Sequence, residues 1–137
     1  EKPAHTFVGY FIGSPGMNFM SVTHRAGNVM FGDLPLPVNE AISRSVAASS
    51  SSNIKLGIRP EFISVSQTPG ADSVPIEVVN LQDLGTYSLL SFTLNGQLFK
   101  ARLPEGHAPI GDAAHATFSD QHIALYVDEY LVEIGHE

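Results

Sequence analysis

The fold class is decided by residues 90–103, which read LSFTLNGQLFKARL. Apolar and polar residues alternate up to Leu94 and again after Gly96, as in a strand with one buried face. Asn95-Gly96 is the residue pair that favours a type I′ turn, because both turn positions need a positive φ. The segment therefore predicts a two-stranded antiparallel hairpin, with Phe99 as a core residue.

Short apolar segments separated by turn residues continue through most of the chain. Strands are expected at 17–21, 29–31, 54–58, 74–81, 113–118 and 123–127. Short strands with turn signals about every eight to twelve residues are typical of sandwiches and small barrels. We therefore expect an all-β fold built from short antiparallel strands.

Two segments interrupt this pattern. Residues 3–12 have apolar side chains at helical spacing behind a proline suited to a first helical position, and the turn 13–16 (GSPG) ends them. The serine-rich residues 47–53 predict a flexible loop. We expect a single domain over 1–137, with a short N-terminal connector helix and turn at 1–16 and a β-barrel at 17–137.

The charge is unevenly distributed along the chain. The formal net charge is −7, and residues 105–137 contain acidic residues but no Lys or Arg. A solvated acidic face and a docking patch for a basic partner both account for such a stretch. Because an acidic surface repels phosphate backbones, we expect no nucleic-acid binding.

The sequence lacks the residues that several kinds of chemistry require. There is no cysteine, and no Gly-x-x-x-x-Gly-Lys phosphate loop or Gly-x-Ser-x-Gly elbow. His115 and His122, with Asp120 between them, are the one candidate for a metal site, but exposed or capping histidines fit this spacing better. No stretch of about 18 apolar residues is present to span a membrane. We expect neither a catalytic site, a metal site nor a bound cofactor in this chain.

Two motifs suggest a family. Residues 11–19 (FIGSPGMNF) and 57–61 (GIRPE), in this order and at this distance, resemble the C-terminal regulatory domain of the ATP-binding subunits of carbohydrate ABC importers, the maltose and glycerol-phosphate type. That domain contains a transport-associated oligonucleotide-binding (OB) barrel. The resemblance covers nearly the whole chain and implies an OB-like fold. The chain departs from the family pattern at Gln82-Asp83 and at Leu125-Tyr126-Val127-Asp128. These differences concern the subfamily and the transported sugar and not the fold.

The resemblance implies a role without catalysis. Such a domain contacts its own ATPase domain and a second copy in a homodimer, and acts indirectly on membrane permease subunits and with a regulatory protein. ATP and Mg²⁺ would bind to the ATPase domain, and the complex would lie at the cytoplasmic face of the membrane. The contact residues it implies are Ser14, Pro15, Asn18, Arg59, Pro60 and Glu61. A surface or intramolecular ion pair is the alternative for Arg59 and Glu61.

Two further functions remain open. The first is a small-ligand module for an oxyanion or a sugar, because related barrels bind molybdate or tungstate between subunits, and backbone amides with Lys, Ser or Thr would be needed. The second is an OB-type nucleic-acid binder, which fold analogy alone supports.

Overall fold

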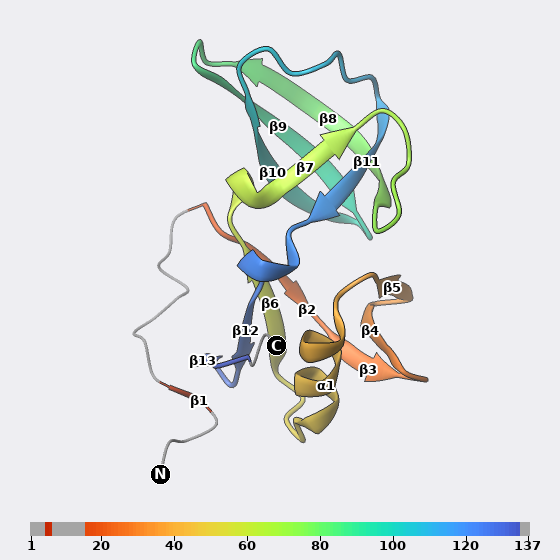
Figure 1. The fold of residues 1–137 in the computed structure, drawn as a ribbon, viewed down its shortest axis with the longest axis vertical. Helices are drawn as coiled ribbons and strands as arrows, with labels where there is room; N and C mark the ends of the chain where they lie inside the picture. The colour runs from red at the N-terminus through yellow and green to blue at the C-terminus, as the bar shows by residue number, and fades with distance from the viewer. Residues whose placement is uncertain (1–4, 7–15, 135–137) are drawn as a thin grey trace. The chain divides into compact units, whose positions relative to one another are not determined.

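The structure is a computed structural model that describes residues 5–6 and 16–134 (Figure 1). Internal contacts divide the chain into two compact units. Unit 1 comprises residues 1–58 and 123–137, and unit 2 comprises residues 59–122. The chain expected to form one domain thus has two compact units, and each is described by itself.

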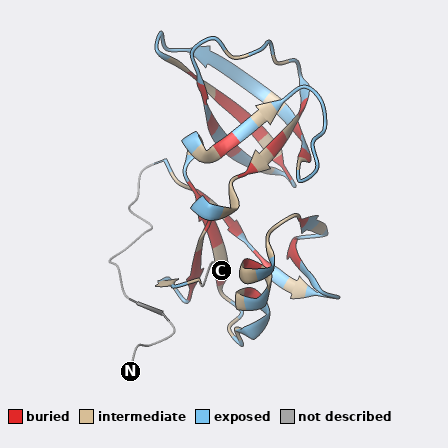
Figure 2. Cartoon of the chain, viewed as in Figure 1, coloured by how far each residue is buried: buried red, intermediate tan, exposed pale blue. Residues whose placement is uncertain are grey.

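The described residues of unit 1 form two antiparallel sheets and one α-helix. The larger sheet has the order β1 (His5–Thr6), β13 (Tyr130–Val132), β12 (Ala124–Val127), β6 (Ile54–Ile58) and β2 (Asn18–Ser21). The smaller sheet has the order β3 (Thr23–Arg25), β4 (Asn28–Phe31) and β5 (Leu34–Leu36). Leu56 and Leu125 are paired in the larger sheet and fully buried, so they form the middle of its core. Buried residues follow one another along β6 and β12 (Figure 2).

Helix α1 (Glu40–Ala48) packs against β3 and β4. The Asn39 side chain accepts a hydrogen bond from the backbone N–H of Ile42 at 2.9 Å, which satisfies one of the free donors at the helix start. Ile42 and Val46, four residues apart, lie on one face and are buried. The helix reaches Ala48, so the loop expected at 47–53 begins two residues later than predicted. Local helix propensity and the packing against β3 and β4 account for these two additional helical residues.

The helix expected at residues 3–12 is wrong at the two positions of this segment that the structure describes. His5 and Thr6 form strand β1, paired with Val132 and Leu131 of β13. Long-range pairing with a strand near the other end of the chain overrides the local helical spacing. The rest of the predicted helix and its GSPG turn, apart from Gly16, lie outside the described residues.

Unit 2 is a curled five-stranded antiparallel sheet, as predicted for an OB-like barrel (Figure 1). Its order is β10 (Gln97–Pro104), β9 (Tyr87–Leu94), β8 (Val74–Asp83), β11 (Ala113–Phe118) and β7 (Ile63–Ser66). Short 3₁₀ helices lie at Pro60–Phe62 (η2) and Asp120–His122 (η3). Unit 2 alone forms this curled sheet, whereas the described residues of unit 1 form sheets of their own.

The predicted hairpin is confirmed in unit 2. Asn95 and Gly96 have φ of 53° and 78°, as a type I′ turn requires. This turn sets the register in which Phe92 opposes Phe99. The two rings stack with centroids 5.3 Å apart and are fully buried in the core of the barrel.

Candidate interaction sites

The residues 57–61 (GIRPE) cross from the end of unit 1 into the start of unit 2. In unit 1, Gly57 lies opposite Phe19 in the β2–β6 ladder. A Cβ atom at Gly57 would lie 2.9 Å from both Met17 Sδ and Phe19 Cε1, so only glycine fits without movement of these side chains. The backbone at Gly57 is thus approached closely by two side chains of the segment that contains β2.

Asn18 is a polar residue in the interior of unit 1. Its Nδ2 donates a hydrogen bond to the carbonyl oxygen of Ile58 at 3.2 Å, and its backbone pairs with the same residue. A buried amide with this partner avoids the cost of an unpaired polar group. In β2 the buried face is Asn18 and Met20, while Phe19 is only partly buried. The alternation in the sequence gave no sign that an asparagine would take the inner face.

The remaining predicted contact residues begin unit 2. Arg59 precedes η2 in an extended conformation, Pro60 takes its first position, and Glu61 follows in the first turn. Arg59 and Glu61 are exposed, and within the described part of the chain neither forms an ion pair. The intramolecular pair considered as an alternative is therefore not found among residues 5–6 and 16–134. Ser14 and Pro15 lie outside the described residues.

Glu61 lines a shallow pocket of about 430 Å³ in unit 2. The Arg102 guanidinium lies over the Tyr87 ring, 4.0 Å from its centroid, and both residues line the same pocket. The other lining residues are Thr86, Leu103, Pro104 and Glu105. The carboxylates of Glu61 and Glu105 outnumber the single guanidinium of Arg102, which disfavours binding of an anion. A neutral ligand with many hydroxyl groups fits this mixture of acceptors, donors and an aromatic ring better.

The pairing of Arg102 with Tyr87 could have been predicted. Counting outward from the Asn95-Gly96 turn places Arg102 opposite Leu89, so that Tyr87 is its diagonal neighbour. The sequence analysis fixed the turn but did not continue the register to these positions.

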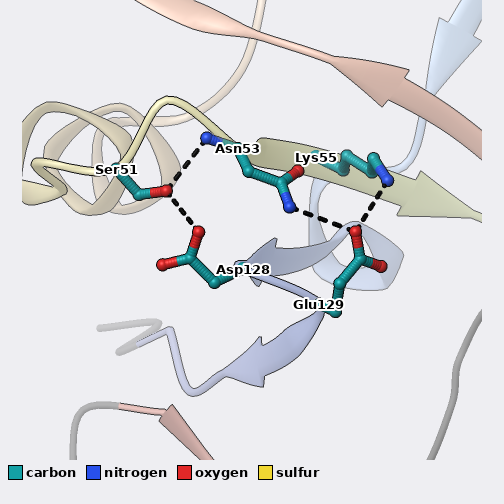
Figure 3. A network of polar contacts seen from close by, with 5 residues as sticks. All are labelled: Ser51, Asn53, Lys55, Asp128 and Glu129. Atoms are coloured by element: carbon teal, nitrogen blue, oxygen red, sulfur yellow. Dashed lines mark hydrogen bonds and ion pairs between the residues drawn. The ribbon is translucent and has the colours of Figure 1, made fainter.

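A polar network stabilises the β12–β13 turn in unit 1 (Figure 3). Ser51 Oγ donates to Asp128 Oδ1 at 2.6 Å, while Asn53 Nδ2 and Lys55 Nζ each lie 3.1 Å from Glu129 Oε2. Asp128 and Glu129 form the two-residue turn with φ of 52° and 73°, a region that side-chain-bearing residues rarely adopt. The network holds this turn against the loop that follows α1.

The same turn borders a second pocket in unit 1, of about 440 Å³. It is lined by Ser45, Ala48, Ser49, Ser50, Ser51, Val127, Asp128, Val132 and Glu133. The predicted serine-rich loop thus contributes hydroxyl groups to a pocket with two carboxylates and no basic residue.

The network lowers the pKa of Glu129. The side-chain hydrogen bond from Asn53, and after it the hydrogen bond from Lys55, hold the pKa below the ordinary value, against a smaller opposing effect of burial. A carboxylate with a depressed pKa stabilises the folded state above the pKa of the unfolded chain, about 4.3, and this stabilisation is lost as the pH falls through the folded-state pKa.

Replacing Glu129 with glutamine should therefore lower stability at pH 7 and have less effect in acid. The expected result is a gap in unfolding free energy between wild type and Glu129→Gln that narrows as the pH falls below about 4.3. Urea titrations from pH 7 to pH 3 measure it. Glu105→Gln, at an exposed position of unit 2, is the control. A pH-independent gap would show that the ionised form of Glu129 adds nothing.

The histidines do not form a metal site in the described part of the chain, where no group of three or more His, Cys, Asp or Glu residues could hold an ion. The His122 ring stacks on Phe62 with centroids 3.7 Å apart, and its Nδ1 lies 2.8 Å from Ser119 Oγ. These contacts give His122 a structural role in unit 2. No described helix is long and apolar enough to cross a membrane.

The curled antiparallel sheet of unit 2 defines a β-barrel module of the OB class. The chain belongs to the TOBE domain family, whose profile matches residues 56–125, and the profile of the MalK OB fold domain matches residues 13–63. The predicted resemblance and OB-like fold are thereby confirmed.

Curated relatives support the same family. The chain is 35% identical over 128 residues to the multiple sugar-binding transport ATP-binding protein MsmK of Streptococcus mutans, covering 87% of this chain and 34% of that protein. It is 32% identical to the sn-glycerol-3-phosphate import ATP-binding protein UgpC of Paraburkholderia xenovorans, covering 92% and 36%. The chain thus spans about a third of the length of these relatives.

A solved structure shares the fold. The cytoplasmic molybdate-binding protein ModG, determined with molybdate bound, superimposes with a TM-score of 0.56 at 12% identity, over 80% of this chain and 95% of that one. At this identity the likeness concerns the fold alone.

Proposed function

We propose that this chain is the non-catalytic C-terminal regulatory and dimerisation part of the ATP-binding subunit of a sugar-type ABC importer. The observation that carries this proposal is the order of two family matches along the chain, the MalK OB fold followed by TOBE, together with relatives that are ATP-binding proteins of sugar and glycerol-phosphate importers. In this role the chain itself would bind neither ATP nor Mg²⁺, which belong to the preceding ATPase domain.

The mechanism is one of coupling between copies. Two regulatory parts in contact would keep two ATPase domains together while the nucleotide sites open and close, and a bound regulator would favour one of these states. The permease subunits would be reached through the ATPase domains, at the cytoplasmic face of the membrane. The coding sequence upstream of Glu1 tests the parentage: it should encode a Walker-type phosphate loop and a magnesium-binding aspartate. A reading frame that begins at Glu1 would contradict the proposal.

Arg59 and Glu61 are the exposed residues of the GIRPE motif and the best candidates for contact with the second copy. If Arg59 of one copy pairs with Glu61 of the other, Arg59→Glu and Glu61→Arg should each raise the dimer dissociation constant about tenfold. The double variant should restore it, because the charges are then exchanged. Analytical ultracentrifugation of the complete subunit, with ATPase activity measured in parallel, would show this.

Arg25→Glu provides the matched control for these variants, because Arg25 is an exposed arginine of unit 1 outside the motif. Unchanged dimer mass and ATPase activity in both single variants would exclude a contact role for Arg59 and Glu61.

A second candidate function is the binding of a small neutral ligand. It rests on the pocket of Glu61, Tyr87 and Arg102, which offers a ring edge, a guanidinium and carboxylate acceptors. ModG binds molybdate, but the two carboxylates around Arg102 favour a sugar over an oxyanion here. Calorimetric titration with molybdate and with disaccharides distinguishes the two ligands, and no heat with either at millimolar concentration removes this candidate.

A further inference from the structure

Strand β8 has an open edge in its second half. On one side, β9 pairs with it from Glu77 to Asp83. On the other side, β11 pairs with it only from Val74 to Glu77. Beyond the backbone bond from Val78 N–H to the carbonyl oxygen of Asp112, at 2.7 Å, no described strand continues along this side. Residues 79–83 therefore present free backbone donors and acceptors there.

The open edge carries exposed apolar side chains. Val79, Leu81 and Leu84 are 60%, 39% and 43% exposed, and they account for three of the five large apolar residues exposed in the described chain. A β-bulge lies between Val78 and Asn80, which leaves Val79 as the extra residue. Leu81 pairs with the fully buried Leu90, so the core face of the barrel continues outward to the edge.

Apart from the bulge at Val79, this edge lacks several features that usually protect an edge strand. Natural proteins place lysine, proline or a covering segment at such edges to prevent pairing with other chains. Residues 76–84 (IEVVNLQDL) contain neither lysine nor proline, and every residue from 79 to 84 is exposed. An edge with these properties is suited to adding a strand from a partner.

The charges at this edge indicate the chemistry of the partner. Glu77 and Asp83 lie on β8, and Asp112 lies where the β11 pairing ends. From Gln67 to Phe99 the sequence contains no Lys, Arg or His. A second copy would bring carboxylates of the same sign to this edge, whereas a basic segment would be attracted to it.

We propose that the open edge of β8, residues 79–84, binds an extended segment of a partner protein in which apolar and basic residues alternate. The segment adds an antiparallel strand to the barrel. Its backbone pairs with the free groups of β8, and its apolar side chains cover Val79 and Leu81. Its Lys or Arg residues lie on the opposite face of the sheet, which carries Glu77. The proposal stands independently of the importer role.

The probe is a fluorescein-labelled heptapeptide of alternating lysine and valine. The fluorescence anisotropy of this peptide is measured at low salt while the 137-residue chain is added. Val79→Lys should weaken binding at least about tenfold, because it removes an apolar contact and repels the probe. Leu98→Lys is the matched control: Leu98 is 54% exposed on β10 and should leave the affinity within about twofold.

A second probe separates strand addition from charge attraction alone. It has the same number of lysines but adjacent prolines at its centre, which remove backbone donors on both sides, so that it cannot form a continuous ladder with a strand edge. Its binding should be at least about tenfold weaker. In the complex with the first probe, amide hydrogen exchange should slow at residues 79–83 and not in unit 1.

Three results would overturn the proposal. The first is equal affinity of the chain for the two probes. The second is an equal loss of affinity for the first probe in Val79→Lys and Leu98→Lys. The third is self-association of the wild type that Val79→Lys abolishes and that the first probe does not compete with. The last result would assign the edge to a second copy of this chain.

Discussion

Replacing Phe99 with alanine is expected to lower the free energy of unfolding by about 3–5 kcal/mol. Phe99 has no exposed surface, stacks on Phe92 at 5.3 Å and contacts Phe118 with ring centroids 6.5 Å apart. Its removal leaves a cavity in the middle of the barrel that neighbouring strands cannot close. Because a domain is stable by only about 5–15 kcal/mol, the loss would unfold a measurable fraction of unit 2.

Urea denaturation followed by circular dichroism measures this loss. Leu98→Ala is the matched control, because Leu98 is the preceding residue on the same strand and points outward, with 54% of its surface exposed. Its cost should stay within about 0.5 kcal/mol. Similar costs for the two variants would contradict the inward orientation of Phe99 and the hairpin register. The two units can unfold separately, so amide exchange in unit 2 should confirm which transition has moved.

The second large effect is expected at Gly57. Gly57→Ala should cost about 1–3 kcal/mol, because the new methyl group would overlap Met17 Sδ and the Phe19 ring, each at 2.9 Å. The flexible Met17 side chain can move more easily than the ring, which Tyr126 contacts edge-on. The strain therefore falls mainly on Phe19 and on the pairing of β2 with β6.

Thermal and urea unfolding of four variants test the Gly57 prediction. Gly70→Ala is the control, because no atom lies within 4 Å of a Cβ there; its effect should stay within about 1 kcal/mol. Phe19→Ala creates room, so the double variant with Gly57→Ala should cost less than the sum of the single variants. Additive costs would show that Phe19 is not what excludes a side chain at Gly57.

Much of the β structure followed from local patterns. The Asn95-Gly96 turn and the alternation on both sides of it determined the β9–β10 hairpin. The strands expected at 29–31, 54–58, 74–81, 113–118 and 123–127 correspond to β4, β6, β8, β11 and β12. Such features are predictable because a turn residue or a two-residue period acts over a few residues.

The errors concern long-range pairing. Helical spacing at the N-terminus predicted a helix, but β13 pairs with His5 and Thr6. The expected strand at 17–21 also gave no indication that Asn18 would face inward with Met20, where the Ile58 carbonyl offers its amide a partner. No local pattern states which distant segment will supply a partner, so neither outcome could be read from the residues themselves.

The sequence by itself determined the family and the all-β character. Only the tertiary structure decided that Glu61 shares a pocket with Tyr87 and Arg102, and that Glu129 is held by Asn53 and Lys55. It also decided that β11 ends its pairing at Glu77 and leaves the edge of β8 open. Motifs and turns are encoded within a few residues, whereas pockets and strand edges depend on where separate segments meet.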